Sequence, residues 1–214
     1  KLPYLTFLLN ARIEKYGPPE NAYRPIPNTK TLKAVLTSVG GGTESEMYGP
    51  IEDWDVSAVT DMYALFSPTN IHKLLSKSNI SAWDVSNVND MHDMFNGVVA
   101  FEGTLNGDLS AWDVSNVTRM DGMFLGATAF NGDLSKWKVG NVLSTYFMFY
   151  KAVAFNQDLS EWDVSNVTNM SNMFHEATAF NQDLSAWDVS NVTNMSEMFQ
   201  GATAFNQPTF KKVG

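Results

Sequence analysis

The sequence predicts an α/β solenoid of leucine-rich-repeat type, a right-handed coil of six repeats with one short parallel strand and one short helix in each repeat. Three observations favour this class. Six tryptophans recur every 25 or 29 residues: Trp54, Trp83, Trp112, Trp137, Trp162 and Trp187. A phenylalanine follows each tryptophan by twelve residues, and ten of the 11 methionines follow one by eight or eleven. A fixed period of this length is typical of solenoids, whose repeats bury apolar faces only against their neighbours.

One repeat, counted from its tryptophan as position 0, contains both expected elements. Trp112 and Val114 flank Asp113, which is the two-residue alternation of a strand. Apolar residues within 120–127 then follow with spacings of three, four and seven, which predicts one face of a short helix. Thr118 precedes this segment and is the expected N-cap. We therefore expect a narrow parallel sheet on one face of the array and a row of helices on the other.

The chain divides into four parts on this reading. Residues 1–28 form a non-repeat N-terminal arm, and residues 29–50 form a capping helix with a lead-in. The six repeats occupy residues 51–207, and residues 208–214 form a tail. A short helix is expected over 30–38, ended by the glycines at 40–42. The arm either shields the first repeat or docks another protein.

Composition excludes several classes of function. The chain has 14 basic and 23 acidic residues, a net charge of −9, which disfavours binding to nucleic acid. It has no cysteine, so disulfides, thiolate metal sites and cysteine nucleophiles are excluded. No apolar run is long enough for a transmembrane segment. His72, His92 and His175 show no ligand spacing. We expect a protein that is not an enzyme and needs no cofactor.

The repeats resemble a known family. The units WDVSNVTNMSNMFHEATAFNQDLS and WDVSNVTNMSEMFQGATAFNQ are similar to the BspA-like leucine-rich-repeat surface proteins, and more narrowly to a mycoplasma-type family of unknown function with a 25-residue repeat. The resemblance covers roughly residues 30–207. It implies a solenoid, frequent secretion or surface display, and binding rather than catalysis, with no shared active site to transfer. Val117 departs from ordinary leucine-rich repeats, which have Asn or Cys there.

Repeat position 1 forms a column of charged residues on the predicted sheet face: Asp55, Asp84, Asp113, Lys138, Asp163 and Asp188. Because neighbouring strands lie about 5 Å apart, stacked carboxylates should repel. They should then either bind divalent cations weakly or have raised pKa values. The alternatives are a solvated face, a partner-binding face and a cation site.

Other columns are expected to be structural. The second aspartate column should cap backbone N–H groups at the corners (Asp108, Asp133, Asp158, Asp183). The asparagine columns at positions 4 and 19 should form hydrogen-bonded stacks. The methionines should belong to the core rather than to a metal site.

The candidate partner-binding residues are those that the repeat does not require. They are the exposed apolar residues of the arm, the first-repeat insertion and the C-terminal edge: Tyr4, Phe7, Leu8, Tyr16, Tyr23, Ile71, Leu74, Leu75 and Phe210. Interfaces recruit aromatic and aliphatic groups of this kind. We expect a protein-interaction module that binds another protein, extracellular or at a cell surface, in adhesion, recognition or scaffolding. One alternative is a structural or linker subunit of a larger assembly, inside an organelle after presequence cleavage. A further alternative is a regular surface that binds cations or ice.

Overall fold

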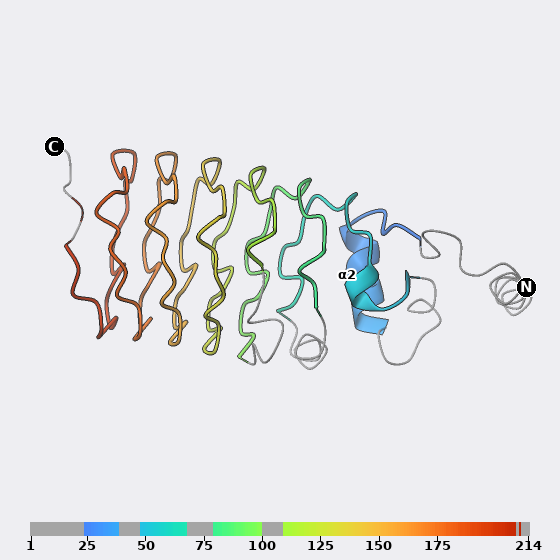
Figure 1. Cartoon of the computed structure of the whole chain (residues 1–214), viewed down its shortest axis with the longest axis horizontal. Helices are drawn as coiled ribbons and strands as arrows, with labels where there is room; N and C mark the ends of the chain where they lie inside the picture. Colours follow the sequence, from blue (N-terminus) through green and yellow to red (C-terminus); the bar gives the residue numbers. More distant parts are fainter. Residues whose placement is uncertain (1–23, 39–47, 68–78, 100–108, 209, 211–214) are drawn as a thin grey trace, which may run out of the picture.

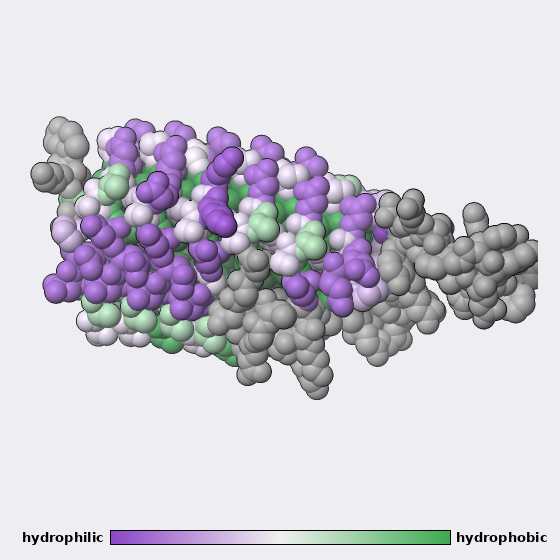
Figure 2. Space-filling view, viewed as in Figure 1, coloured by the Kyte–Doolittle hydropathy of each residue, from purple (hydrophilic) through white to green (hydrophobic). Residues whose placement is uncertain are grey.

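Six repeats stack side by side along the long axis of the molecule (Figure 1). The computed structural model describes residues 24–38, 48–67, 79–99, 109–208 and 210. Two helices are described, and both lie before the first tryptophan: α2 (Thr29–Ser38) and the 3-10 helix η1 (Ile51–Asp53). We call the described part of each repeat a coil. The face of the stack in Figure 2 is mostly hydrophilic, as expected where outward positions are polar.

Helix α2 confirms the helix predicted over 30–38, with a start one residue earlier. Asn28 caps its N-terminus, because its side-chain oxygen accepts a 3.0 Å hydrogen bond from the backbone N–H of Thr31. One face of the helix is buried, with Leu32, Val35 and Leu36 at most 2% exposed. These apolar side chains belong to the same core as the repeats.

The segment around α2 is also tied to the first coil by hydrogen bonds. The backbone N–H of Ile26 donates to the carbonyl of Asp55 over 2.8 Å. The hydroxyl of Thr29 donates to the carbonyl of Asp61. Helix α2 therefore covers the N-terminal end of the stack.

The strand predicted at the tryptophan is wrong. Parallel pairing occurs instead at position 7, as single bridges between neighbouring repeats: Asp61 with Asp90, Asp90 with Arg119, Arg119 with Ser144, Ser144 with Asn169, and Asn169 with Asn194. The chain is turned on both sides of each tryptophan. In the third repeat the N–H of Trp112 bonds the carbonyl of Leu109, and the N–H of Val117 bonds that of Val114. These four-residue turns on either side leave too short a segment at Trp112 for a strand ladder.

The helix predicted within each repeat is also wrong for the described residues. Residues 120–127 form consecutive turns, and Gly122 and Gly126 have φ of 59° and 68°. Positions 10 and 14 have positive φ in every described copy, mostly without glycine: Ala64, Asp93, Phe147, Lys151, Asn172, Glu176 and Glu197. A right-handed helix cannot pass through left-handed residues four apart. The leucine-rich-repeat class of the coil stays a prediction.

Backbone amides at the even repeat positions of this segment donate to carbonyls of the next coil rather than to carbonyls of their own coil. In the fifth repeat the amides of Met170 and Phe174 donate to the carbonyls of Asn194 and Met198 over 2.8 and 2.9 Å. The odd-position amide of Met173 closes a turn onto Met170 within the coil. The segment is therefore a series of turns whose spare amides hold the stack together.

Columns of aromatic rings form the core. The position-12 phenylalanines stack at centroid distances of 5.3 to 5.6 Å along the array. Trp162 is 3% exposed and stacks on its equivalents in the two neighbouring repeats at 6.5 and 6.4 Å. Phe174 is fully buried. Trp162 and Phe174 are therefore buried and stack on their copies one coil away, as the fixed period of the sequence predicts.

Polar side chains connect the coils at the corners. Each position-4 asparagine donates from its side-chain amide to the position-3 carbonyl of the preceding coil: Asn87, Asn116, Asn141, Asn166 and Asn191. At position 19, the side-chain oxygen of Asn156 accepts the backbone N–H of Asn181 over 2.9 Å. The hydrogen-bonded asparagine columns are confirmed. The core placement of the described methionines is confirmed as well, since those at positions 8 and 11 belong to or pack against the core.

Candidate interaction surfaces

The aspartate column at position 1 supplies corner hydrogen bonds. One carboxylate oxygen of Asp163 accepts the hydroxyl of Ser165 over 2.6 Å and its backbone N–H over 3.1 Å. The backbone bond recurs at each other aspartate of the column: Asp55, Asp84, Asp113 and Asp188. An aspartate that accepts the N–H two residues ahead forms a local turn.

These bonds reverse the predicted pKa shift. The hydroxyl and then the N–H of Ser165 lower the pKa of Asp163, and the serines two residues ahead act in the same order on the pKa of Asp84 and Asp113. For Asp188 the N–H of Ser190 lowers the pKa most and its hydroxyl comes second. The neighbouring carboxylate of Asp188 raises the pKa of Asp163, but by less than these bonds lower it. The expected rise in pKa is therefore wrong for these four aspartates, because hydrogen bonds to the ionised form outweigh repulsion between exposed charges.

Lys138 replaces aspartate in this column and adds an opposite charge. Its ammonium group contributes to the lowered pKa of Asp113. Among the described residues, no three histidine or acidic side chains gather in a way that could hold a metal ion. The described column is a row of corner bonds rather than a cluster of ligands.

The second aspartate column caps corners as predicted. Asp133, Asp158 and Asp183 accept the backbone N–H two residues ahead over 2.8 to 2.9 Å. Their equivalent Asp108 lies outside the described residues. The capping role is confirmed for the three that are described.

Most of the predicted partner-binding residues lie outside the described residues: Tyr4, Phe7, Leu8, Tyr16, Tyr23, Ile71, Leu74 and Leu75. Phe210 is described, and contrary to the expectation it is not an exposed side chain at the C-terminal edge. Its ring stacks on Trp187 at 6.0 Å with an angle of 6°, and it is partly buried. Phe210 covers the outer face of the Trp187 ring, which no seventh repeat covers among the described residues.

The fourth repeat has exposed apolar residues that the sequence analysis did not select. Leu143 and Tyr146 are 52% and 38% exposed. The same positions in the fifth repeat carry Thr168 and Ser171. The signal was available, because a position that is polar in both neighbouring repeats, with Asp121 and Ser171, here carries an aromatic ring.

Tyr146 belongs to an aromatic cluster. The ring of Tyr146 lies 4.1 Å from that of Phe147, and Phe147 meets Tyr150 edge-on at 4.9 Å. Tyr150 stacks on His175 of the next repeat at 4.9 Å, and the ammonium group of Lys151 lies 5.2 Å from the Tyr150 ring. We call Leu143, Tyr146, Phe147 and Tyr150 the fourth-repeat patch. The ring contacts among Tyr146, Phe147 and Tyr150 hold these aromatic side chains in place at the surface.

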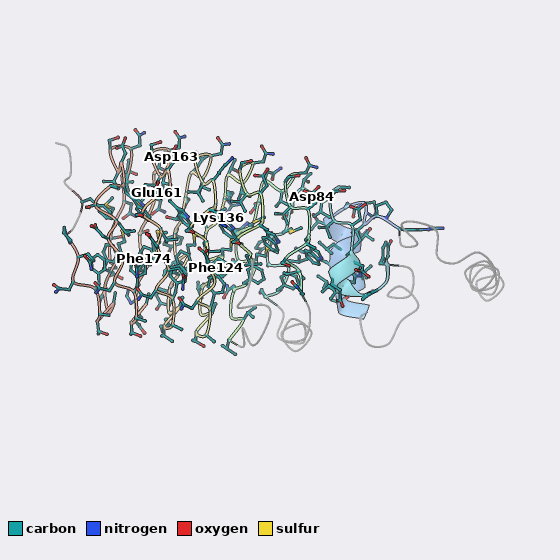
Figure 3. All side chains as sticks on the ribbon, viewed as in Figure 1. Asp84, Phe124, Lys136, Glu161, Asp163 and Phe174 are labelled. Carbon is teal, nitrogen blue, oxygen red and sulfur yellow. The ribbon has the colours of Figure 1, made fainter. Side chains whose placement is uncertain are left out.

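The fourth repeat also differs in charge. Between Asp133 and Asp158 the chain has three lysines, Lys136, Lys138 and Lys151, and no acidic residue. Figure 3 places Lys136 between Asp84 toward the N-terminal end and Glu161 and Asp163 toward the C-terminal end. The middle of the array is thus a basic region in a protein that is acidic overall.

Comparisons with known proteins identify a family. The family model described as "Mycoplasma protein of unknown function, DUF285" matches residues 36–152 and 141–212. This confirms the mycoplasma-type resemblance. No curated protein and no solved structure matches the chain. In the described part of the chain, no helix has the length and apolarity needed to cross a membrane.

Proposed function

The chain belongs to the DUF285 family, and we propose that it is a protein-interaction module without enzymatic activity whose contact surface includes the fourth-repeat patch. The observation that carries this proposal is the exposure of Leu143 and Tyr146, at 52% and 38%, on positions that are polar in the next repeat. The repeat does not need apolar side chains there. Exposed aromatic groups with fixed geometry are the groups that interfaces recruit.

The partner in this proposal is another protein. Aromatic rings gain binding energy when a complementary surface removes them from water. The nearby lysines favour a partner with acidic groups at its rim, since the rest of this chain would repel such groups. We assign the module to adhesion or recognition at a cell surface, within the BspA-like leucine-rich-repeat class that its repeats resemble. The competing arrangement is a structural subunit of a larger assembly.

The test replaces the patch with the residues of the fifth repeat. The patch variant carries Leu143→Thr, Tyr146→Ser, Phe147→Asn and Tyr150→His, all of which this backbone already accommodates one coil away. The control variant changes equivalent outward positions of the sixth repeat, as Ser196→Ala, Glu197→Asn and Gln200→His. Both variants should fold like the wild type, as measured by circular dichroism and thermal unfolding.

The readout is the complex that forms in cells naturally producing the protein, captured by cross-linking and identified by mass spectrometry. We expect the wild type and the control variant to form the same stoichiometric complex and the patch variant to lose it. A complex that survives in the patch variant would reject the patch as the contact surface. A wild-type protein that is monomeric and cross-links to no protein would reject the interaction module itself.

A further inference from the structure

The face formed by the tryptophan segments has two basic side chains in its middle. Lys136 and Lys138 lie directly before and after Trp137, and both are exposed. In the next repeat the same two positions carry Glu161 and Asp163, which are exposed as well. Figure 3 shows Lys136 one repeat away from Glu161 and Asp163. Two neighbouring coils of one face therefore carry opposite charges at matching positions.

These four charged groups form no ion pair within the described part of the chain. No carboxylate lies within 4.0 Å of either lysine nitrogen, and no basic group lies that close to Glu161 or Asp163. Asp163 uses only its Oδ1 atom for its corner bonds to Ser165, so its Oδ2 atom is available to a cation from outside. The face thus offers two basic and two acidic groups to a partner.

The coils on either side have small side chains at the position before the tryptophan. These are Ala111 in the third repeat and Ala186 in the sixth, both exposed. The tryptophans of all four coils are buried. An alanine does not hold an approaching surface away, and the long lysine side chains can reach across a gap. The third to sixth coils therefore form a low surface from which the charged groups project.

Two copies that meet through this face can be related by a two-fold axis in one of two directions. An axis along the array places each repeat against itself and exchanges the two positions, so Lys136 would face Lys138 of the second copy. An axis across the array makes the copies antiparallel and keeps each position against the same position. If that axis passes between the fourth and fifth repeats, Lys136 faces Glu161 and Lys138 faces Asp163. Each relation occurs twice, which gives four pairs of opposite charges.

Shifted antiparallel placements bring like charges together near the centre of the contact. With the axis through the fourth repeat, Lys136 would face its own copy. With the axis between the third and fourth repeats, Asp163 would face Asp84. With the axis between the second and third repeats, the lysines would again face acidic residues, but Asp84 would face Asp113 at the centre. The charge pattern therefore selects one register.

We propose that this face binds a second copy of the same chain in antiparallel orientation, with the two-fold axis between the fourth and fifth repeats. Lys136 and Lys138 of each copy pair with Glu161 and Asp163 of the other. Exposed ion pairs are individually weak, and the contact spans only four coils, so the dimer is weak and depends on all four pairs. The contact is separate from the fourth-repeat patch, whose residues occupy repeat positions 6 to 13.

The first experiment exchanges the charges of the two repeats. One variant carries Lys136→Glu and Lys138→Asp, and the other carries Glu161→Lys and Asp163→Lys, so each copies a neighbouring repeat. The first lowers the net charge of −9 by four and the second raises it by four, so a mixed dimer has the same total charge as a wild-type dimer. Sedimentation velocity at about 0.1 M salt should detect dimers of the wild type and of the mixture. Each variant alone should dimerise at least about tenfold more weakly, because like charges meet.

A control variant makes the same change in charge outside the contact. It carries Arg24→Glu and Lys30→Glu, at exposed positions before the first repeat, and should dimerise like the wild type. The patch variant should dimerise as well, which distinguishes a failure of the fourth-repeat contact from a failure of this one. A monomeric wild type would overturn the proposal. So would a mixture that dimerises no better than its separate components.

A second experiment does not depend on how the charge variants fold. The chain has no cysteine, so Ala111→Cys and Ala186→Cys each introduce a single thiol. In the proposed dimer these two positions face each other, whereas within one chain they lie three repeats apart. A short thiol-specific cross-linker should join the two variants in a mixture and should join neither variant to itself. Self-linking at the yield of the mixture, or no cross-linking at all, would show that the register is wrong.

Discussion

Thr145 is a polar residue in a place where the repeat has methionine. It occupies position 8, where Met62, Met91, Met120 and Met170 are fully buried, and it is itself only 2% exposed. Its hydroxyl has no hydrogen-bond partner among the described residues. A buried hydroxyl without a partner lowers stability because it has lost its hydrogen bonds to water. We predict that Thr145→Val stabilises the protein.

The magnitude follows from what the substitution changes. The backbone bonds stay, with the Thr145 N–H donating to Asn169 and the Thr145 carbonyl accepting from Met148, each over 3.0 Å. Removing an unsatisfied buried polar group recovers about 1–3 kcal/mol. The added methyl must fit a close-packed site, which offsets part of this gain. We expect the free energy of unfolding to rise by about 1–2 kcal/mol, a shift of roughly 2–8 °C in Tm for a chain of this size.

The assay is urea unfolding followed by tryptophan fluorescence, with thermal unfolding as a second measure. The control is Thr168→Val, because the Thr168 hydroxyl is exposed and donates to the carbonyl of Leu143 over 3.1 Å. That variant should lose about 0.5–1 kcal/mol. A Thr145→Val protein no more stable than the wild type would refute the reasoning, since it would show that the hydroxyl is satisfied in solution.

Three further predictions concern the backbone, the core and the corners. Ala64 has a φ of 50°, so Ala64→Gly should raise the free energy of unfolding by about 0.5–1 kcal/mol. The control Ala58→Gly, at an exposed position without positive φ, should lower it. Denaturant unfolding that ranks the two variants in the opposite order would contradict the assigned turns. Trp162→Ala should cost about 3–5 kcal/mol, because the indole is 3% exposed within a ring column; an unchanged Tm would reject the register. The lowered pKa of Asp163 means that its contribution to stability is present above the ordinary value of 3.8 and is lost as pH falls below it. Ser165→Ala should raise that pKa toward its ordinary value in an NMR titration, and a titration identical to the wild type would show that the serine hydroxyl has no role.

The register of the stack could be predicted because it depends on residues that pack against their own copies. Trp162 and Phe174 recur at fixed spacing, and identical rings one coil apart must meet if the repeats stack. The capping helix could be predicted for a similar reason. Asn28 precedes residues 29–38 as an N-cap, and one face of this segment is apolar and buried. In both cases local pattern and long-range packing agree.

The internal helix could not be distinguished from turns by its pattern. Consecutive turns place apolar residues at the same spacings of three, four and seven as a helix face. The distinguishing feature is positive φ at positions 10 and 14, and glycine marks it openly at Gly122 and Gly126 of the third repeat. Phe147 and Lys151 of the fourth repeat adopt the same conformation. A sequence pattern alone gives no reason to expect left-handed backbone at those two residues.

The candidate surfaces were only partly predictable. The aspartate column was correctly placed as exposed, but its pKa direction depends on hydrogen bonds from Ser165 and its equivalents two residues ahead, whereas the prediction considered only repulsion between the carboxylates. The fourth-repeat patch was missed because the candidate partner-binding residues were taken only from the arm, the first-repeat insertion and the C-terminal edge. The significance of Tyr146 and Phe147 depends on comparing each outward position with its copies in other repeats.

The two ends of the array also differ in how easily they open. The first coil is held by α2 and by the bonds of Ile26 and Thr29, whereas the last coil contacts a neighbour on one side and Phe210 on the other. In a linear array each coil is stabilised only by its neighbours, so the weakest boundary determines where disassembly starts. In a protein made of residues 1–214, unfolding should therefore travel from the sixth coil toward α2, one repeat at a time. A protease with access to the unfolded chain would then leave fragments that share an N-terminus and shorten in steps of about one repeat.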